Sequence, residues 1–286
     1  MKQQEYEWMI RELFDARVED VVRNIGDIKL VRFDKEKMSF PSGLETQIAT
    51  AWENEVQSAR SAGRAEPRNN RFVHCKGVQV AYRADIPADL VFNCGETDFM
   101  HYSMLTKVDP TKRIWGIGTT GVTYFTNKEG ERVYVFATRD HTKVKNVGGK
   151  IEAPPGGYLD IGLVEQLYTG QKTTPSTLFW NNTEKEFEEE LCLPPNKIKS
   201  HRPVEVIRIL STHDISVDYV IELDASEEEL RDGFRRGKKY GGEHATQFFI
   251  PESKLAAFVQ DNQGALTPRT KSNLRNYLLT TPTLVE

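Results

Sequence analysis

Two stretches of the sequence decide how its second half folds: Pro154-Pro155-Gly156-Gly157-Tyr158-Leu159-Asp160 and, downstream, Lys185-Glu186-Phe187-Glu188-Glu189-Glu190-Leu191. On a helix, residues three and four positions apart share a face, so the second stretch places Glu186, Glu189 and Glu190 together. Like charges so placed repel one another unless a cation lies between them, and carboxylate oxygens suit Mg²⁺ or Mn²⁺. The two glycines allow the backbone to approach such a cation or a phosphate closely. Together the stretches predict a divalent-metal site that handles a diphosphate.

The composition is that of a soluble globular protein. The 286 residues are 38% apolar and 28% charged, which is enough for one large domain or two smaller ones. The formal charge of −4 argues against a nucleic-acid-binding protein, because such proteins need a basic face. The three cysteines form no metal-ligand pattern, and no apolar run is long enough for a signal peptide or a membrane span. We therefore expect a cytoplasmic protein that contacts neither nucleic acid nor membrane.

We expect residues 113–286 to form one domain. In this domain the two stretches quoted above connect strands to a helix. Apolar, β-branched runs over 114–125 and 132–138 predict a hairpin. Thr174 begins the acidic helix, which is expected to end near Leu191. The other elements expected are a polar excursion at 163–176, a hairpin over 204–223, a helix near 226, a strand over 246–250, and helices over 252–261 and 268–279. This irregular alternation predicts an α+β fold, an α/β/α sandwich around a mixed sheet, rather than a doubly wound parallel sheet.

Residues 1–112 are expected to form a separate N-terminal α/β lobe. Apolar residues at helical spacing predict one helix over 5–24, which ends before Gly26. A second helix is expected to begin at Ser42, because Ser42 has capping-box spacing to Glu45. The remaining elements expected here are strands at 28–33, 72–82 and 89–93 and an irregular stretch at 94–112.

A Gly-Gly turn followed by a helix with Lys-Glu-x-x-Glu-Glu resembles the Nudix box, G-x5-E-x7-R-E-U-x-E-E-x-G-U, in which U is aliphatic. Gly157 matches the first glycine of this pattern, and Glu186, Glu189 and Glu190 match its three downstream glutamates. The hairpin that ends in Arg139 resembles the pair of strands that leads into the box in this family. The departures are Leu163, Lys185 and Cys192 at the earlier glutamate, the arginine and the late glycine, and a longer segment between the two halves.

The chain resembles more closely one divergent Nudix branch, the UDP-glucose/UDP-galactose diphosphatases of animals, and this resemblance accounts for the departures from the box. That branch also has a stretched box and a large N-terminal lobe. The stretches 49–53, 178–194 and 216–220 resemble its early helix, its extended box helix and its next strand. The resemblance implies a hydrolase, dependent on Mg²⁺ or Mn²⁺, that cleaves the diphosphate of a nucleoside diphosphate-linked substrate. A UDP-sugar, giving UMP and sugar 1-phosphate, is the substrate expected first.

The resemblance also implies roles for single residues. The expected metal ligands are Glu186, Glu189, Glu190 and the carbonyl of Gly156, which would neutralise the diphosphate and activate a water. The general base is expected in the loop before a late strand, where Glu243 lies, with Glu190 as its rival. The residues expected to hold the substrate are Arg139, Lys143, Lys145, Gly157 and His244.

Two alternatives to a UDP-sugar hydrolase remain open. The first keeps the chemistry and changes the substrate to ADP-ribose or another nucleoside diphosphate derivative. The second is a catalytically inactive Nudix-fold module that binds a nucleotide, and it is motivated by Leu163, Lys185 and Cys192 in the box. Three roles remain open for the N-terminal lobe. It could cover the site, bind the nucleoside, or form the interface of a homodimer.

Overall fold

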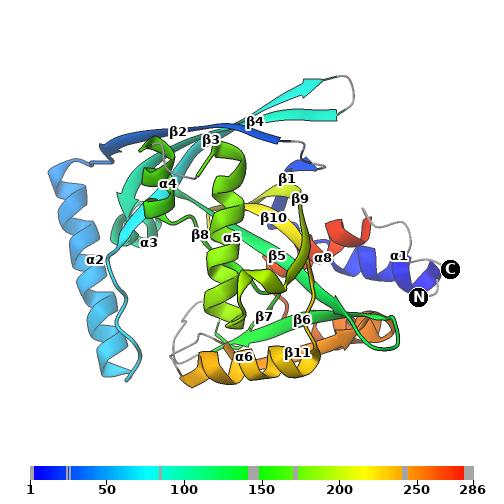
Figure 1. Ribbon diagram of the computed structural model, residues 1–286. Coiled ribbons are helices and arrows are strands. Elements are labelled where there is room, and N and C mark those ends of the chain that lie inside the picture. The colour runs from blue at the N-terminus through cyan, green and yellow to red at the C-terminus, as the bar shows by residue number, and fades with distance from the viewer. Residues whose placement is uncertain are drawn as a thin grey trace.

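One large β-sheet runs through the protein, with helices on both of its faces (Figure 1). The computed structural model describes residues 3–23, 25, 27–83, 86–140, 148–169, 173–239 and 244–279. The strands are β1 (Val18–Arg23), β2 (Asp27–Lys37), β3 (Arg71–Arg83), β4 (Ile86–Asp98), β5 (Trp115–Thr126), β6 (Arg132–Arg139), β7 (Ile151–Glu152), β8 (Gly156–Tyr158), β9 (Ile198–Ile209), β10 (Asp214–Leu223) and β11 (His244–Pro251). Their main order is β1-β9-β10-β5-β3-β4-β2. Off this path, β6 and β8 pair with β5, and β7 and β11 pair with β6.

The helices cover this sheet and its ends. They are α1 (Gln3–Glu12), α2 (Ser42–Ser61), α3 (Phe99–Val108), α4 (Ile161–Tyr168), α5 (Pro175–Leu191), α6 (Glu227–Lys239), α7 (Leu255–Asn262) and α8 (Pro268–Leu279), with short 3₁₀ turns at Pro195–Lys197 and Glu252–Lys254. In the part of the chain that the structure describes, none of these helices is long and apolar enough to cross a membrane.

The predicted fold class is confirmed, because the sheet is mixed and carries helices on both faces. The two predicted hairpins form, with β6 antiparallel to the end of β5 and β10 antiparallel to β9. β10 also runs parallel to β5 over ten residue pairs, from Asp214 opposite Gly116 to Leu223 opposite Phe125. β5 therefore lies at the centre of the sheet, which explains its continuous run of buried residues.

Each face of the sheet has its own core. On β10, Val217 and Ile221 pack with Phe187 of α5 on one face. Val220 lies on the other face, in a cluster with Tyr277 of α8. This division follows from the strand period of two, which sends successive side chains to opposite faces. Each fully buried side chain of this size contributes about 1.5–3 kcal/mol to the free energy of unfolding, so both helices are held firmly on the sheet.

Three predictions of secondary structure are wrong. The helix expected over 5–24 ends at Glu12, and the valines of Val18–Arg23 form strand β1, paired with β9. β-Branched residues favour a strand where a sheet edge is available, and β9 supplies that edge. The excursion expected at 163–176 contains most of helix α4, and the stretch 94–112 contains the end of β4 and helix α3.

The predicted boundary after residue 112 remains a prediction, but the sheet runs across it. β3, from the first part of the chain, pairs with β5 through His74 opposite Gly116 and Cys75 opposite Trp115. β1 pairs with β9 at the far end of the same sheet. Helix α1 packs against α7 and α8. The first 112 residues therefore share backbone hydrogen bonds and core contacts with the rest of the protein.

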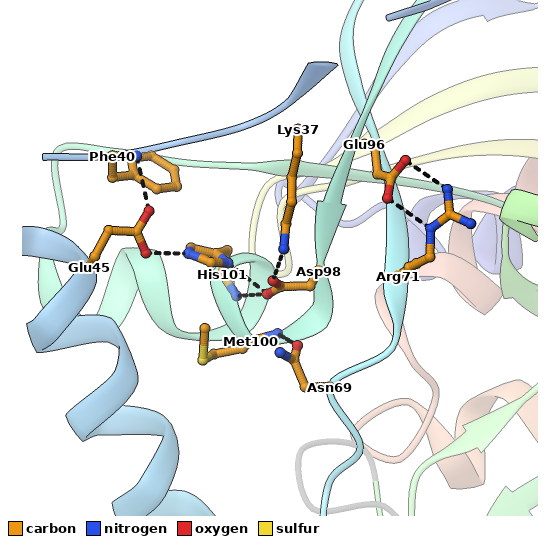
Figure 2. A network of polar contacts seen from close by, with 9 residues as sticks. All are labelled: Lys37, Phe40, Glu45, Asn69, Arg71, Glu96, Asp98, Met100 and His101. Atoms are coloured by element: carbon orange, nitrogen blue, oxygen red, sulfur yellow. Dashed lines mark hydrogen bonds and ion pairs between the residues drawn. The ribbon is translucent and has the colours of Figure 1, made fainter. Parts of the chain in front are cut away.

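A polar network attaches α2 to this sheet (Figure 2). The buried His101 of α3 has Nδ1 2.7 Å from Asp98 Oδ1 and Nε2 2.7 Å from Glu45 Oε2. Glu45 does not form the predicted capping box with Ser42, because its Oε1 accepts a hydrogen bond from the Phe40 N–H at 3.0 Å. Lys37 of β2 lies 2.8 Å from the second oxygen of Asp98. His101 is thus a structural link between α2, α3 and the sheet.

Candidate active site

The strand β8 places the Gly-Gly turn between the centre of the sheet and the acidic helix. Thr119 and Thr120 of β5 pair with Gly157 and Gly156, and the N–H of Gly121 donates to the Pro155 carbonyl at 3.0 Å. The Glu186 carboxyl group packs directly against Gly157. It occupies the space that the Cβ of any other residue at position 157 would need. The turn and the helix are therefore in contact, as their order in the sequence predicts.

Glu190 joins this contact from the next turn of α5. Its Oε2 accepts a hydrogen bond from the Gly156 N–H at 3.0 Å, and its Oε1 lies 3.2 Å from the guanidinium of Arg139. Arg139 also forms an ion pair with Glu152 of β7. His244, the first residue of β11, has Nε2 2.9 Å from Glu152 Oε1. Ligand atoms of Glu152, Glu190 and His244 all lie within 4.8 Å of one another.

A second set of contacts holds the turn to α5 from the other side. The Asp160 carboxylate caps α4 by accepting from the Gly162 N–H at 2.6 Å, and it lies 2.5 Å from Lys185 Nζ. The Asp160 N–H donates to Asn182 Oδ1 at 2.8 Å, and Asn182 Nδ2 donates to Thr119 Oγ1 at 3.1 Å. Lys185 and Asn182 thus hold this loop against α5, and α4 lies between the loop and α5 in the sequence.

The departure at Cys192 also has a local explanation. Cys192 is the C-cap of α5 and has φ 52°, in the left-handed region where glycine is most common. Its N–H donates to the Glu188 carbonyl at 3.1 Å, so the helix ends in the expected place.

The structure brings some of the predicted site residues together and leaves others aside. Glu186, Glu190, Gly156, Gly157, Arg139 and His244 form one group. Glu189 lies on the same helix, but its side chain is 59% exposed and forms an ion pair at 3.7 Å with Lys185. Glu243, Lys143 and Lys145 fall outside the residues that the structure describes.

Glu152 is the site residue that the sequence did not reveal. It lies in a strand of only two residues, β7, which pairs with Ala137 and Thr138 of β6. The one signal available was its place two residues before Pro154, on the approach to the Gly-Gly turn. No local pattern in the sequence predicts that β7 pairs with β6. Glu152 meets His244 only because β7 and β11 both pair with β6 in the sheet.

Burial changes the acidity of this group. Removal from water, and then the charges of Glu190 and Glu189, raise the pKa of Glu186 to about 8. Burial also raises the pKa of Glu190, against the effect of Arg139 and His244. Burial opposes ionisation of Glu152, but the Arg139 charge and the His244 hydrogen bond outweigh it and lower the pKa of Glu152. The pKa of His244 is raised, because the Glu152 hydrogen bond and the Glu190 charge outweigh burial.

These residues fit a hard divalent cation. Glu186 and Glu190 are carboxylates held at a backbone turn, and Glu186 lies where another positive charge would favour its ionised form. Oxygen ligands of this kind are the set that Mg²⁺ and Mn²⁺ prefer. Glu152 forms an ion pair with Arg139, and His244 Nε2 lies 2.9 Å from Glu152 Oε1 and 4.0 Å from Glu190 Oε1.

The raised pKa of Glu186 predicts how stability depends on pH without metal. The unfolded chain releases this proton near pH 4.5, while the folded protein keeps it until about pH 8, so stability falls as pH rises through this window. Because Glu186 is partly exposed, we expect a loss of about 2 kcal/mol, smaller than its full shift implies. Chemical unfolding from pH 5 to pH 8.5 should show this loss in the wild type and not in Glu186→Gln. Parallel curves for the two proteins would contradict the assignment.

The sequence matches no family model, and no curated protein is significantly similar to it. Among solved structures, the chain is similar to a Nudix hydrolase from Alicyclobacillus acidocaldarius, with 10% identity, a TM-score of 0.40, and coverage of 59% of this chain and 92% of that one. It is also similar to RenU, a Nudix hydrolase from M. smegmatis, with 15% identity, a TM-score of 0.33, and coverage of 60% and 92%. With so few identical residues, the roles of residues in this chain follow from its own geometry.

Proposed function

We propose that this protein is a Nudix-type hydrolase that uses Mg²⁺ or Mn²⁺ to cleave the diphosphate of a nucleoside diphosphate-linked substrate. The observation that carries the proposal is the contact of Gly156 and Gly157 with the carboxylates of Glu190 and Glu186. It joins hard oxygen ligands to a backbone turn that has no side chains to exclude a phosphate. The first substrate we propose is a UDP-sugar, on the resemblance of the stretched box to the animal diphosphatases, and the second is ADP-ribose.

The proposed reaction is a hydrolysis. The oxygen of a water attacks one phosphorus, the P–O bond to the bridging oxygen breaks, and the two products are phosphate monoesters. A divalent cation, when bound, neutralises the diphosphate and lowers the pKa of the attacking water. Glu186 and Glu190, with the Gly156 carbonyl, would hold the cation, and Glu189 reaches the same side of α5 from a more exposed position. The proton passes to Glu243 or to Glu190, whose raised pKa suits a proton acceptor.

One observation favours the inactive binding module as a second candidate. The guanidinium of Arg139 contacts both Glu152 and Glu190, and so places a positive charge beside a proposed metal ligand. An arginine in this position can take the place of the cation in a protein that binds a nucleotide without cleaving it, or it can hold a phosphate of a substrate in the hydrolase. The two candidates differ in whether any substrate is turned over when Mg²⁺ is added.

A substrate panel tests the proposal. Purified protein with Mg²⁺ should release phosphatase-sensitive products from a UDP-sugar, ADP-ribose or a dinucleotide, and EDTA should abolish the release. Nucleotide binding by calorimetry without turnover of any substrate would favour the binding module. Turnover that persists in EDTA would contradict the metal assignment.

A further inference from the structure

Arg269, in the first turn of α8, lies beside the candidate active site without being held by it. Its guanidinium is 3.7 Å from Asp214 Oδ2, which is too long for a hydrogen bond. Tyr158, Asp218 and Glu152 also surround it closely enough to act on its charge. Among the described residues, no hydrogen bond from this guanidinium is found, and 23% of the side chain is exposed. It therefore has N–H donors to offer to a ligand.

Tyr158 stands next to the Gly-Gly turn, and both Tyr158 and Arg269 lie close to Asp214. It follows Gly157 directly in β8, and 37% of the residue is exposed. Its hydroxyl lies 2.9 Å from the hydroxyl of Tyr102, which donates to Asp214 Oδ1 at 2.6 Å. The Phe72 ring packs against its ring at 4.8 Å between centroids. Two residues from the first 112 thus hold an exposed aromatic ring in one orientation.

The two residues differ from the other charged and aromatic groups around the site. Arg139 is engaged with Glu152 and Glu190, whereas Arg269 has only the loose pair with Asp214 among the described residues. Against the effect of burial, the carboxylates around Arg269 raise its pKa and keep it charged. The unused N–H donors of a charged arginine suit an anion that accepts two hydrogen bonds, as a phosphate group does. A fixed and exposed aromatic ring beside it offers a face to a ring of the same ligand.

We propose that Arg269 and Tyr158 form a substrate subsite, in which Arg269 binds a phosphate oxygen and Tyr158 contacts the ring of the group attached to that phosphate. This inference rests on the proposed function for the identity of the substrate, but not on turnover. It gives the N-terminal part of the chain a role in recognition, because Tyr102 and Phe72 hold Tyr158 in place. It also restricts the substrate to phosphate esters of a ring-bearing group, such as a nucleoside or a sugar.

Binding without metal tests the subsite separately from catalysis. Calorimetry in EDTA would measure the dissociation constants of UDP, which has a ring, and of inorganic pyrophosphate, which has none. Arg269→Gln should weaken the binding of both ligands by about tenfold or more, and Arg269→Lys should restore part of it. Tyr158→Ala should weaken UDP by about fivefold to tenfold and leave pyrophosphate unchanged, and Tyr158→Phe should bind both normally. Arg275→Gln is the matched control, since Arg275 is on the same helix and lies over Phe14.

Each outcome decides the inference. Unchanged affinity of both ligands in Arg269→Gln, with a thermal midpoint near that of the wild type, would overturn it, as would a wild type that binds neither ligand in EDTA. If Tyr158→Ala weakened the binding of UDP and of pyrophosphate equally, Tyr158 would not contact the ring of the ligand. If Arg269→Gln does not fold, Arg269→Lys carries the same comparison. If the affinities change as expected but the protein hydrolyses no substrate, the subsite is supported and the proposed hydrolysis is contradicted.

Discussion

Glu190→Gln is expected to lower kcat by about 10²- to 10⁴-fold, because the substitution removes a proposed metal ligand and possible proton acceptor at the centre of the site. The amide keeps the size of the side chain and can still accept the hydrogen bond from the Gly156 N–H. It cannot balance the charge of Arg139, which contacts the same side chain at 3.2 Å. Steady-state hydrolysis with Mg²⁺ would give kcat and KM, and metal titration would show whether affinity for the ion falls with it.

Glu188→Gln is the matched control for this experiment. Glu188 is on the same helix two residues earlier, and it is exposed on a different face. It changes the net charge by the same amount, so a general electrostatic effect would appear in both variants. The metal assignment would be abandoned if Glu190→Gln and Glu188→Gln had the same kcat as the wild type.

Gly157→Ala is expected to reduce turnover by about 100-fold while the protein still folds. A Cβ at this position would overlap the Glu186 carboxyl group, whose atoms are the three nearest to it. The carboxyl group is the end of a flexible side chain, so it can turn aside at a cost of about 1–3 kcal/mol. Turning aside removes a proposed ligand from the turn, and the loss should therefore appear in activity and metal affinity more than in stability.

Two other glycines give the comparison for Gly157→Ala. Gly43→Ala adds a Cβ with no atom within 4 Å, in the first turn of α2, and should leave turnover unchanged. Gly118→Ala would push a Cβ into the Gly157 carbonyl of the neighbouring strand, which cannot move aside, so folding itself should suffer. A Gly157→Ala protein with wild-type kcat would show that Glu186 is not needed where it now lies.

The helix α5 could be predicted because its signals are local. Thr174 accepts a hydrogen bond from the Thr177 N–H, Pro175 occupies the first turn, and the buried Phe187 and Leu191 lie on one face. These features act within a few residues of one another, and they define the glutamate face before any tertiary contact is made. The same kind of reasoning failed for β1, since a valine-rich segment becomes helix or strand according to whether a sheet edge lies beside it.

The sequence by itself determined the pairing of a Gly-Gly turn with a glutamate-bearing helix, because glycine conformation and helix period depend on neighbours along the chain. Only the tertiary structure decided which glutamates meet that turn. The register of β8 against β5 brings Gly157 to Glu186, and the pairing of β6 with both β7 and β11 brings Glu152 to His244. Those contacts join residues far apart in the chain, and their burial raises the pKa of Glu186 and of Glu190. The chemistry of the candidate site thus depends on packing that no single stretch of sequence contains.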